Sequence, residues 1–170
     1  LTNPSNGTAL DIGSFGISMA FDNLFTGRSL AQIGTESSLS DPYIGGSAGY
    51  VQVVPVNGKG AVLVVAPHRN TSTQIEAWRM LQSDPTPRSV TFEGIYEALT
   101  HSAAFVTEEW ASSTGPWNQP TAAVSLLPGE SRVFAWRFAL AKEGVRDVFR
   151  VVNALGLPTA EATPGYVLAS

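Results

Sequence analysis

The chain has 170 residues, a formal net charge of −4, and 44% hydrophobic against 14% charged residues, a balance typical of an ordered globular domain and not of a disordered chain. Its ten Lys and Arg residues are spread singly, which argues against partners such as nucleic acid or an anionic membrane surface. No apolar run approaches the roughly 18 residues of a membrane span, and the lack of cysteine excludes disulfides, thiolate metal sites and cysteine nucleophiles.

The first half of the chain is predicted to be mostly β. Residues 12–21 carry glycines and alternating apolar residues, which favours a strand, whereas residues 26–50 are rich in Gly, Ser and Asp-Pro and indicate a loop with short extended pieces. Two β-branched runs, YVQVVPV (50–56) and AVLVVAPH (61–68), are joined by Asn57-Gly58-Lys59-Gly60. Because Asn-Gly can supply two positive-φ positions, we predict a tight hairpin between them.

The next part of the chain is less uniform. Residues 75–82 and 89–97 are predicted strands, and residues 98–110 fit both the helical and the extended pattern, so that both states stay open. Residues 122–141 favour two strands flanking a Pro128-Gly129 turn, with one face formed by Phe134, Trp136, Phe138 and Leu140.

A helix is predicted near residues 144–155. Its apolar stripe ends at Gly156, with Pro158 just beyond, and consists of Val145, Val148, Phe149, Val152 and Leu155. Turn signals at short intervals between the strands predict a single antiparallel β-sandwich domain over residues 1–170, with this one amphipathic helix packed on the sheet edge.

Few side chains suggest a metal or acid–base site. The two imidazoles, His68 and His101, are 33 residues apart with no metal-ligand spacing, so no metal or cofactor is expected. We expect His68 in a surface turn and His101 in a packed or hydrogen-bonding position. Ser102 lies beside His101, but the Gly-x-Ser-x-Gly pattern of a nucleophile elbow does not occur in the sequence.

Aromatic and acidic residues between positions 108 and 117 suggest a carbohydrate contact. Glu108 and Glu109 precede Trp110, and they are either solvated carboxylates or acceptors for sugar hydroxyls. Trp117 lies in the polar, proline-flanked loop STGPWNQPT, where it either stacks on a sugar ring or plugs the core under the loop. Trp78 and Trp136 lie on predicted strands and are expected in the core.

Two sequons, at Asn6 (Asn-Gly-Thr) and Asn70 (Asn-Thr-Ser), lie in turn-like polar stretches. They would be glycosylated on a eukaryotic secretory route. Together with the low Lys content and the high Ser, Thr and Gly content, they predict a secreted, extracellular glycoprotein.

Four blocks of the sequence carry a family resemblance. In chain order they are FEGIYEALTHSAAFVTEEW, GPWNQPT, LLPGESRVFAWRFALAKEGVRD and LGLPTAEATPGYVL. They resemble blocks of large secreted fungal and bacterial proteins of poorly characterised function. Those proteins are similar to glycoside hydrolases that have an N-terminal β-supersandwich and a following helical barrel. The resemblance covers residues 92–168, and the first ninety residues only in general character.

The resemblance implies a supersandwich-type fold and a non-catalytic accessory role, structural or carbohydrate-contacting. It also implies polysaccharide or oligosaccharide as a partner, and a helical-barrel domain following in a longer parent chain. It places no catalytic residue on this segment. Two alternatives stay open, namely a stand-alone carbohydrate-binding module and part of a glycosidase active site that uses Glu108 and Glu109.

Overall fold

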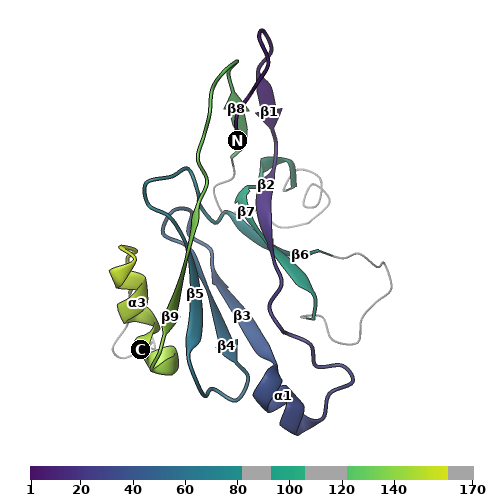
Figure 1. Ribbon diagram of the computed structural model, residues 1–170, viewed down its shortest axis with the longest axis vertical. Coiled ribbons are helices and arrows are strands. Elements are labelled where there is room, and N and C mark those ends of the chain that lie inside the picture. Colours follow the sequence, from purple (N-terminus) through teal and green to yellow (C-terminus); the bar gives the residue numbers. More distant parts are fainter. Residues whose placement is uncertain (82–92, 106–121, 161–170) are drawn as a thin grey trace, which may run out of the picture.

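The structure, a computed structural model, describes residues 1–81, 93–105 and 122–160 (Figure 1). Within these ranges the strands are β1 (Leu10–Ile12), β2 (Phe15–Met19), β3 (Ser38–Tyr43), β4 (Tyr50–Pro55), β5 (Val62–Pro67), β6 (Ala77–Leu81), β7 (Ile95–His101), β8 (Val124–Leu126) and β9 (Trp136–Ala141). The labelled helices are α1 (Leu30–Glu36), the 3-10 turn η1 (Gly144–Asp147) and α3 (Val148–Ala154), and residues 103–105 are also helical. None of the helices in these ranges is long and apolar enough to span a membrane.

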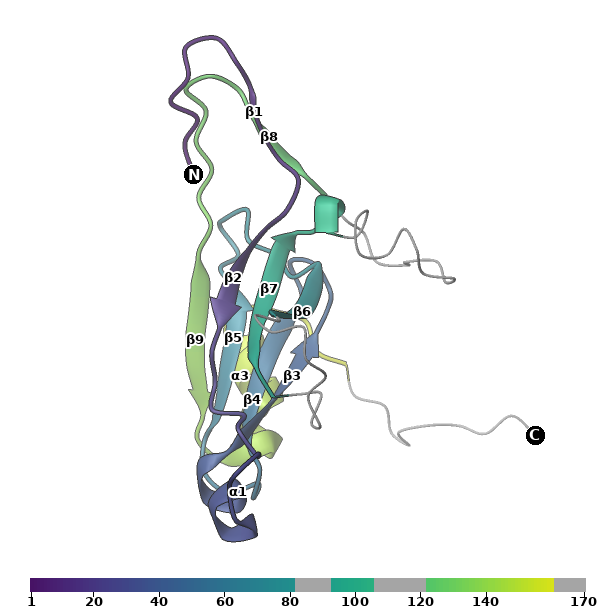
Figure 2. The same ribbon diagram turned by 90° about the vertical axis from the view of Figure 1, so that its right-hand side faces the viewer.

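The strands form antiparallel sheets that pack in layers. A four-stranded sheet has the order β3-β4-β5-β9, a three-stranded sheet the order β2-β7-β6, and β1 pairs with β8 in a small ribbon. Figure 2 shows the two larger sheets face to face, and α3 lies beside β5 and β9 in both views. The predicted antiparallel β-sandwich with a C-terminal helix is therefore confirmed.

Two apolar cores lie on opposite faces of the four-stranded sheet. The core between the sheets contains Val51, Val53 and Val65 from the larger sheet, with Met19 and Ala98 from the smaller one. The core under the helix is formed by Tyr50, Val62, Val64, Ala66, Ala141, Val148, Val151, Val152, Leu155 and Leu157. Since successive strand residues point to opposite faces, β5 contributes alternately to both cores, which explains its unbroken apolar sequence.

The predicted pairing of residues 50–56 with residues 61–68 is confirmed as β4–β5, but the predicted turn is wrong. The positive φ angles belong to Gly58 (66°) and Gly60 (93°), and Asn57 is not among the residues with positive φ. Asn57 instead accepts a hydrogen bond at Oδ1 from the Lys59 N–H (2.8 Å). This side-chain turn leaves Asn57 in ordinary backbone geometry, so the loop is longer than a two-residue hairpin turn.

The turn at Pro128-Gly129 exists, but the strands on either side do not pair with each other. Gly129 has a φ of 77°, while β8 pairs with β1 and β9 pairs with β5. The N-terminal segment takes the place of the expected partner strand, because Thr2 bridges to Ser131 and the Arg132 N–H donates to the Leu1 carbonyl (2.9 Å).

The loop predicted at residues 26–50 contains a helix that the sequence analysis missed. Ser29 Oγ accepts from the Gln32 N–H, and Gln32 Oε1 accepts from the Ser29 N–H, which forms a capping box at the start of α1. The Ser-x-x-Gln spacing is the signal that could have predicted it. β3 follows directly as one of the expected extended pieces.

The other strand predictions shift in their bounds. The strand predicted at residues 12–21 is found as β2, and the one at residues 75–82 as β6. The strand predicted at residues 89–97 begins at Ile95 in the described part of the chain, and it continues to His101 through the stretch left open. Residues 103–105 are helical, so both patterns seen there correspond to real structure.

The predicted C-terminal helix is present, with a rotated buried face. Gly156 has a φ of 82°, its N–H donates to the Asn153 carbonyl, and the Leu157 N–H donates to the Val152 carbonyl. These two bonds form a Schellman motif, so Gly156 ends the helix as predicted. The buried face is Val148, Val151, Val152 and Leu155, while Val145 (51% exposed) and Phe149 (38%) lie at its margin. The helix packs on the face of the sheet rather than on its edge.

We predict that Val152→Ala lowers the free energy of unfolding by about 2 kcal/mol. Val152 is fully buried between α3 and the four-stranded sheet, so the change removes buried methyl groups and leaves a cavity. Val133→Ala is the same chemical change at a 66% exposed side chain. It should alter the free energy of unfolding by no more than about 0.5 kcal/mol. Urea unfolding measures both, and equal losses would show that the helix contributes little to the fold.

Candidate functional site

The residues that the sequence analysis singled out for sugar contact lie outside the described ranges. They are Trp117, Trp110 and Glu109, together with the alternative acid Glu108. Their role therefore stays a prediction. The predicted core residues Trp78 and Trp136 are described, and both are partly buried against the core between the two sheets.

The two predicted glycosylation sites are on the surface. Asn6 and Asn70 are both exposed, and Asn70 follows His68 in a turn where its N–H donates to His68 Nδ1 (3.3 Å). This places His68 in a turn, as expected. The glycosylation itself remains a prediction.

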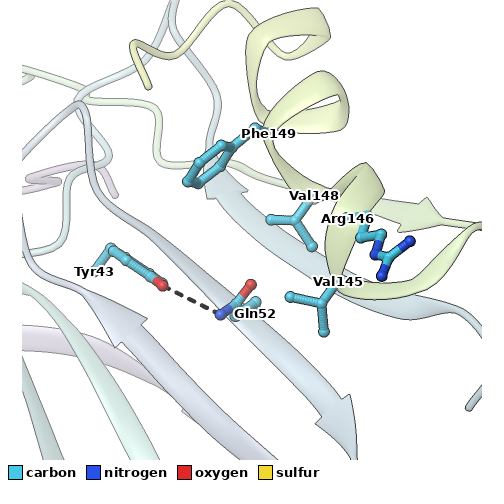
Figure 3. A pocket seen from close by; sticks show the side chains of 6 residues that line it. All are labelled: Tyr43, Gln52, Val145, Arg146, Val148 and Phe149. Atoms are coloured by element: carbon cyan, nitrogen blue, oxygen red, sulfur yellow. Dashed lines mark hydrogen bonds between the residues drawn. The ribbon is translucent and has the colours of Figure 1, made fainter. Parts of the chain in front are cut away.

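A pocket lies on the helix side of the four-stranded sheet (Figure 3). Its floor follows from the β3–β4 register, in which Asp41 faces Gln52 and Tyr43 faces Tyr50. Because paired residues of antiparallel strands share a face, these four side chains lie on the same side of the sheet. That side is the one that α3 covers farther along, over β5 and β9.

The wall of the pocket comes from η1 and the start of α3. Val145, Arg146, Val148 and Phe149 line it opposite Tyr43 and Gln52, and the pocket between them has a volume of about 350 Å³ and is open to solvent. Figure 3 shows Phe149 on the same side as Tyr43, and Arg146 on the opposite side. This volume lies within the roughly 300–1,000 Å³ range of small-molecule sites.

Two stacked tyrosines support the floor. The rings of Tyr43 and Tyr50 are 4.4 Å apart between centroids and nearly parallel, at 11°. Burial raises the pKa of Tyr50 to about 12, and burial together with the negative charge of Asp41 raises the pKa of Tyr43. Both phenols are therefore neutral over the physiological range. Tyr43 is 41% exposed, so it offers a ring face and a hydroxyl to a ligand.

Gln52 is the buried polar group of the pocket. The residue is 7% exposed, and its Nε2 donates to Asp41 Oδ2 (2.7 Å) and to Tyr43 Oη (3.2 Å). These two bonds fix the amide, and its Oε1 accepts no hydrogen bond from the described residues. The pocket thus combines a fixed amide oxygen, a phenol and two aromatic faces, a donor and acceptor set that suits a hydroxylated ligand with an apolar face.

A second polar cluster is buried away from this pocket and centres on Glu76. Its Oε2 accepts from the Ser102 N–H (2.8 Å), the Ser102 hydroxyl (2.8 Å) and the Ala122 N–H (2.9 Å). Its Oε1 accepts from the Gln74 amide (2.6 Å). The carboxylate is only 4% exposed and satisfied on both oxygens, so it joins three chain segments instead of presenting a reactive group.

His101 packs beside this carboxylate. Its Nδ1 lies 3.7 Å from Glu76 Oε1, its ring meets Phe134 edge-on at 5.8 Å, and neither ring nitrogen has a hydrogen-bond partner in the described part of the chain. Desolvation lowers the pKa of His101, against the opposing effect of the Glu76 charge. The predicted packed role is confirmed. Because the Ser102 hydroxyl donates to Glu76 and not to His101, the trio is not arranged as a catalytic triad.

Fold and pocket define a mainly β protein with a small aromatic and polar site under a C-terminal helix. The chain belongs to the DUF5695 family, a family of unknown function, which matches residues 1–170. Neither the curated proteins nor the solved structures gave a match.

We predict that Glu76→Gln lowers the free energy of unfolding by about 3 kcal/mol. Both carboxylate oxygens accept hydrogen bonds, and the amide NH₂ that replaces one of them would face hydrogen-bond donors instead of acceptors. Glu36→Gln is the matched control. Glu36 is half exposed and lies 3.7 Å from Arg28, so we expect less than about 0.5 kcal/mol there. Thermal and urea unfolding of both variants give the comparison. A Glu76→Gln protein as stable as the control would mean that the buried bonds contribute little.

We predict that the free energy of unfolding decreases as the pH is lowered below about 6.5, because of His101. The imidazole takes up a proton near pH 6.5 in the unfolded chain, whereas burial holds its pKa lower in the folded chain. The unfolded state thus gains protons first, and folding loses up to about 1.4 kcal/mol per pH unit from this group. Urea unfolding between about pH 5.5 and 7.5 should show a slope that His101→Phe reduces. A slope that persists in the variant would contradict this origin.

Proposed function

We propose that this chain is a non-catalytic, carbohydrate-contacting β-sandwich domain of a secreted, glycoside-hydrolase-like protein. The observation that carries the proposal is the pocket formed by Tyr43, Gln52 and Phe149. A sugar ring has apolar C–H faces and a rim of hydroxyls. Exposed aromatic rings stack on the first, while a fixed amide and a phenol bond to the second.

The position of the carboxylates supports binding over hydrolysis. Glycoside hydrolysis uses two carboxyl groups on either side of the scissile bond, and the side chains that line the pocket in the described part of the chain include no carboxylate. Glu76 and Glu93 are buried elsewhere. Glu93 accepts from the Thr26 hydroxyl (2.7 Å) and from the Phe25 and Thr26 N–H groups, so it serves the fold.

A secretory route is also part of the proposal. It is supported by the exposure of Asn6 and Asn70, since the transferase that modifies a sequon needs an accessible asparagine. Expression in a eukaryotic secretory host tests this part. Glycans at these asparagines would increase the mass of the chain, and treatment with a deglycosylating enzyme would remove the increase.

We predict that Tyr43→Ala weakens glycan binding at least about fivefold, because it removes roughly 1 kcal/mol of stacking together with the phenol oxygen. The affinity is measured by titrating the full chain with a panel of neutral and acidic oligosaccharides and monitoring binding by NMR. Phe149→Ala should weaken binding in the same direction. Phe138→Ala is the control, because Phe138 is 61% exposed on β9 and lies outside the pocket.

The same titration separates the alternatives. Binding lost in Trp117→Ala but kept in Tyr43→Ala would move the site to the loop predicted from sequence. Release of reducing sugar that disappears on mutation of Glu108 or Glu109 would favour the glycosidase alternative. If no oligosaccharide of the panel binds, the domain is structural and the proposal fails.

A further inference from the structure

We propose that the pocket selects an acidic saccharide, with the carboxylate of a uronic acid unit bound by Arg146. This inference rests on the proposed carbohydrate function and adds the chemical class of the ligand. The anionic group would lie at the Arg146 side of the cavity, and the sugar ring over Tyr43 and Phe149 at the other side (Figure 3).

Charge is the first argument. Among the described residues that line the cavity, Arg146 alone carries a full charge, and the others are aromatic, aliphatic or amide side chains. Arg146 is exposed and forms no ion pair within the described ranges. By contrast, Arg150, one turn farther along, is bound by Asp147 through two bonds, one of them 2.9 Å from Nη2 to Oδ2. The Arg146 guanidinium therefore keeps its donors for a ligand, and its planar fork matches a carboxylate.

The acidic neighbour of the pocket sets the orientation of the ligand. Asp41 is exposed on the same sheet face as Tyr43 and Gln52. It accepts the Gln52 amide bond, and burial together with its negative charge raises the pKa of Tyr43. An anionic group at the tyrosine side would meet this charge, whereas sugar hydroxyls there can donate to the nearby acceptors. The two sides of the pocket thus favour a ligand that is neutral at one end and anionic at the other.

The proposed contact has a predictable salt dependence. The chain carries a net charge of −4, so an acidic saccharide is not attracted to the molecule as a whole and depends on one local cation. An exposed ion pair of this kind weakens as salt rises, because the Debye length falls from about 10 Å at 0.1 M to about 3 Å at 1 M. Selectivity for the acid over a neutral analogue should decrease over that range.

Two probes that differ only in charge test the inference, namely tri-galacturonic acid and its methyl ester. We expect the acid to bind the full chain at least about tenfold more tightly than the ester at low salt, as for a charge-assisted bidentate contact. Arg146→Gln should remove that difference, so that the acid and the ester bind this variant alike. Lys142→Gln removes one charge from an exposed neighbour outside the pocket, and it should keep the difference.

Each other outcome overturns either the uronate assignment or the proposed function. If acid and ester bind alike, or if Arg146→Gln keeps the preference, the uronate assignment fails while glycan binding stands. If a sulfated galactan oligosaccharide binds through Arg146 and the uronate does not, the anionic group is a sulfate ester and the carboxylate assignment is wrong. If none of these probes binds and the neutral glycans of the panel also fail, the proposed function fails as well.

Discussion

The structure depends on the burial of β5 on both faces. Each residue of this strand is apolar, and alternate side chains enter the core under the helix (Val62, Val64, Ala66) or face the smaller sheet (Leu63, Val65). A strand that is apolar on both sides must be covered on both sides. This requirement explains why α3 lies against one face and the β2-β7-β6 sheet against the other.

Local sequence signals predicted the elements that local contacts specify. The β4–β5 pairing, the apolar period of the helix and the glycine that ends it all depend on residues close together in the chain, and all were found, although the β4–β5 turn differs from the predicted one. Pairings between distant segments carried no such signal. β8 pairs with β1 across more than a hundred residues, and the N-terminal residues displaced the expected hairpin at Gly129. Periodicity identifies a strand, but its partner is chosen by competition among all the edges present.

The pocket could not be predicted for a similar reason. Tyr43 lay in a stretch interpreted as a loop, and Val145 and Phe149 belonged to the stripe predicted to be buried. The structure buries Val151 in their place and leaves Val145 and Phe149 at the margin of the helix, where they meet Tyr43 and Gln52. The one signal that the sequence offered is that the apolar stripe of the helix is wider than the sheet surface that the helix covers. This signal does not indicate which side of the stripe stays exposed.

The pocket is a consequence of how short the covering helix is. α3 has seven residues and packs on β5 and β9, so only η1 and the start of α3 reach Tyr43 and Gln52 on the same sheet face. At that margin the register supplies a tyrosine stack and a carboxylate–amide pair instead of aliphatic side chains, with Tyr50 buried and Tyr43 exposed. A hydrophobic core needs cover, whereas stacked phenols and a paired amide tolerate water on one side. The sheet therefore changes from apolar core to a polar and aromatic pocket along a single face, and the margin of the helix marks the boundary.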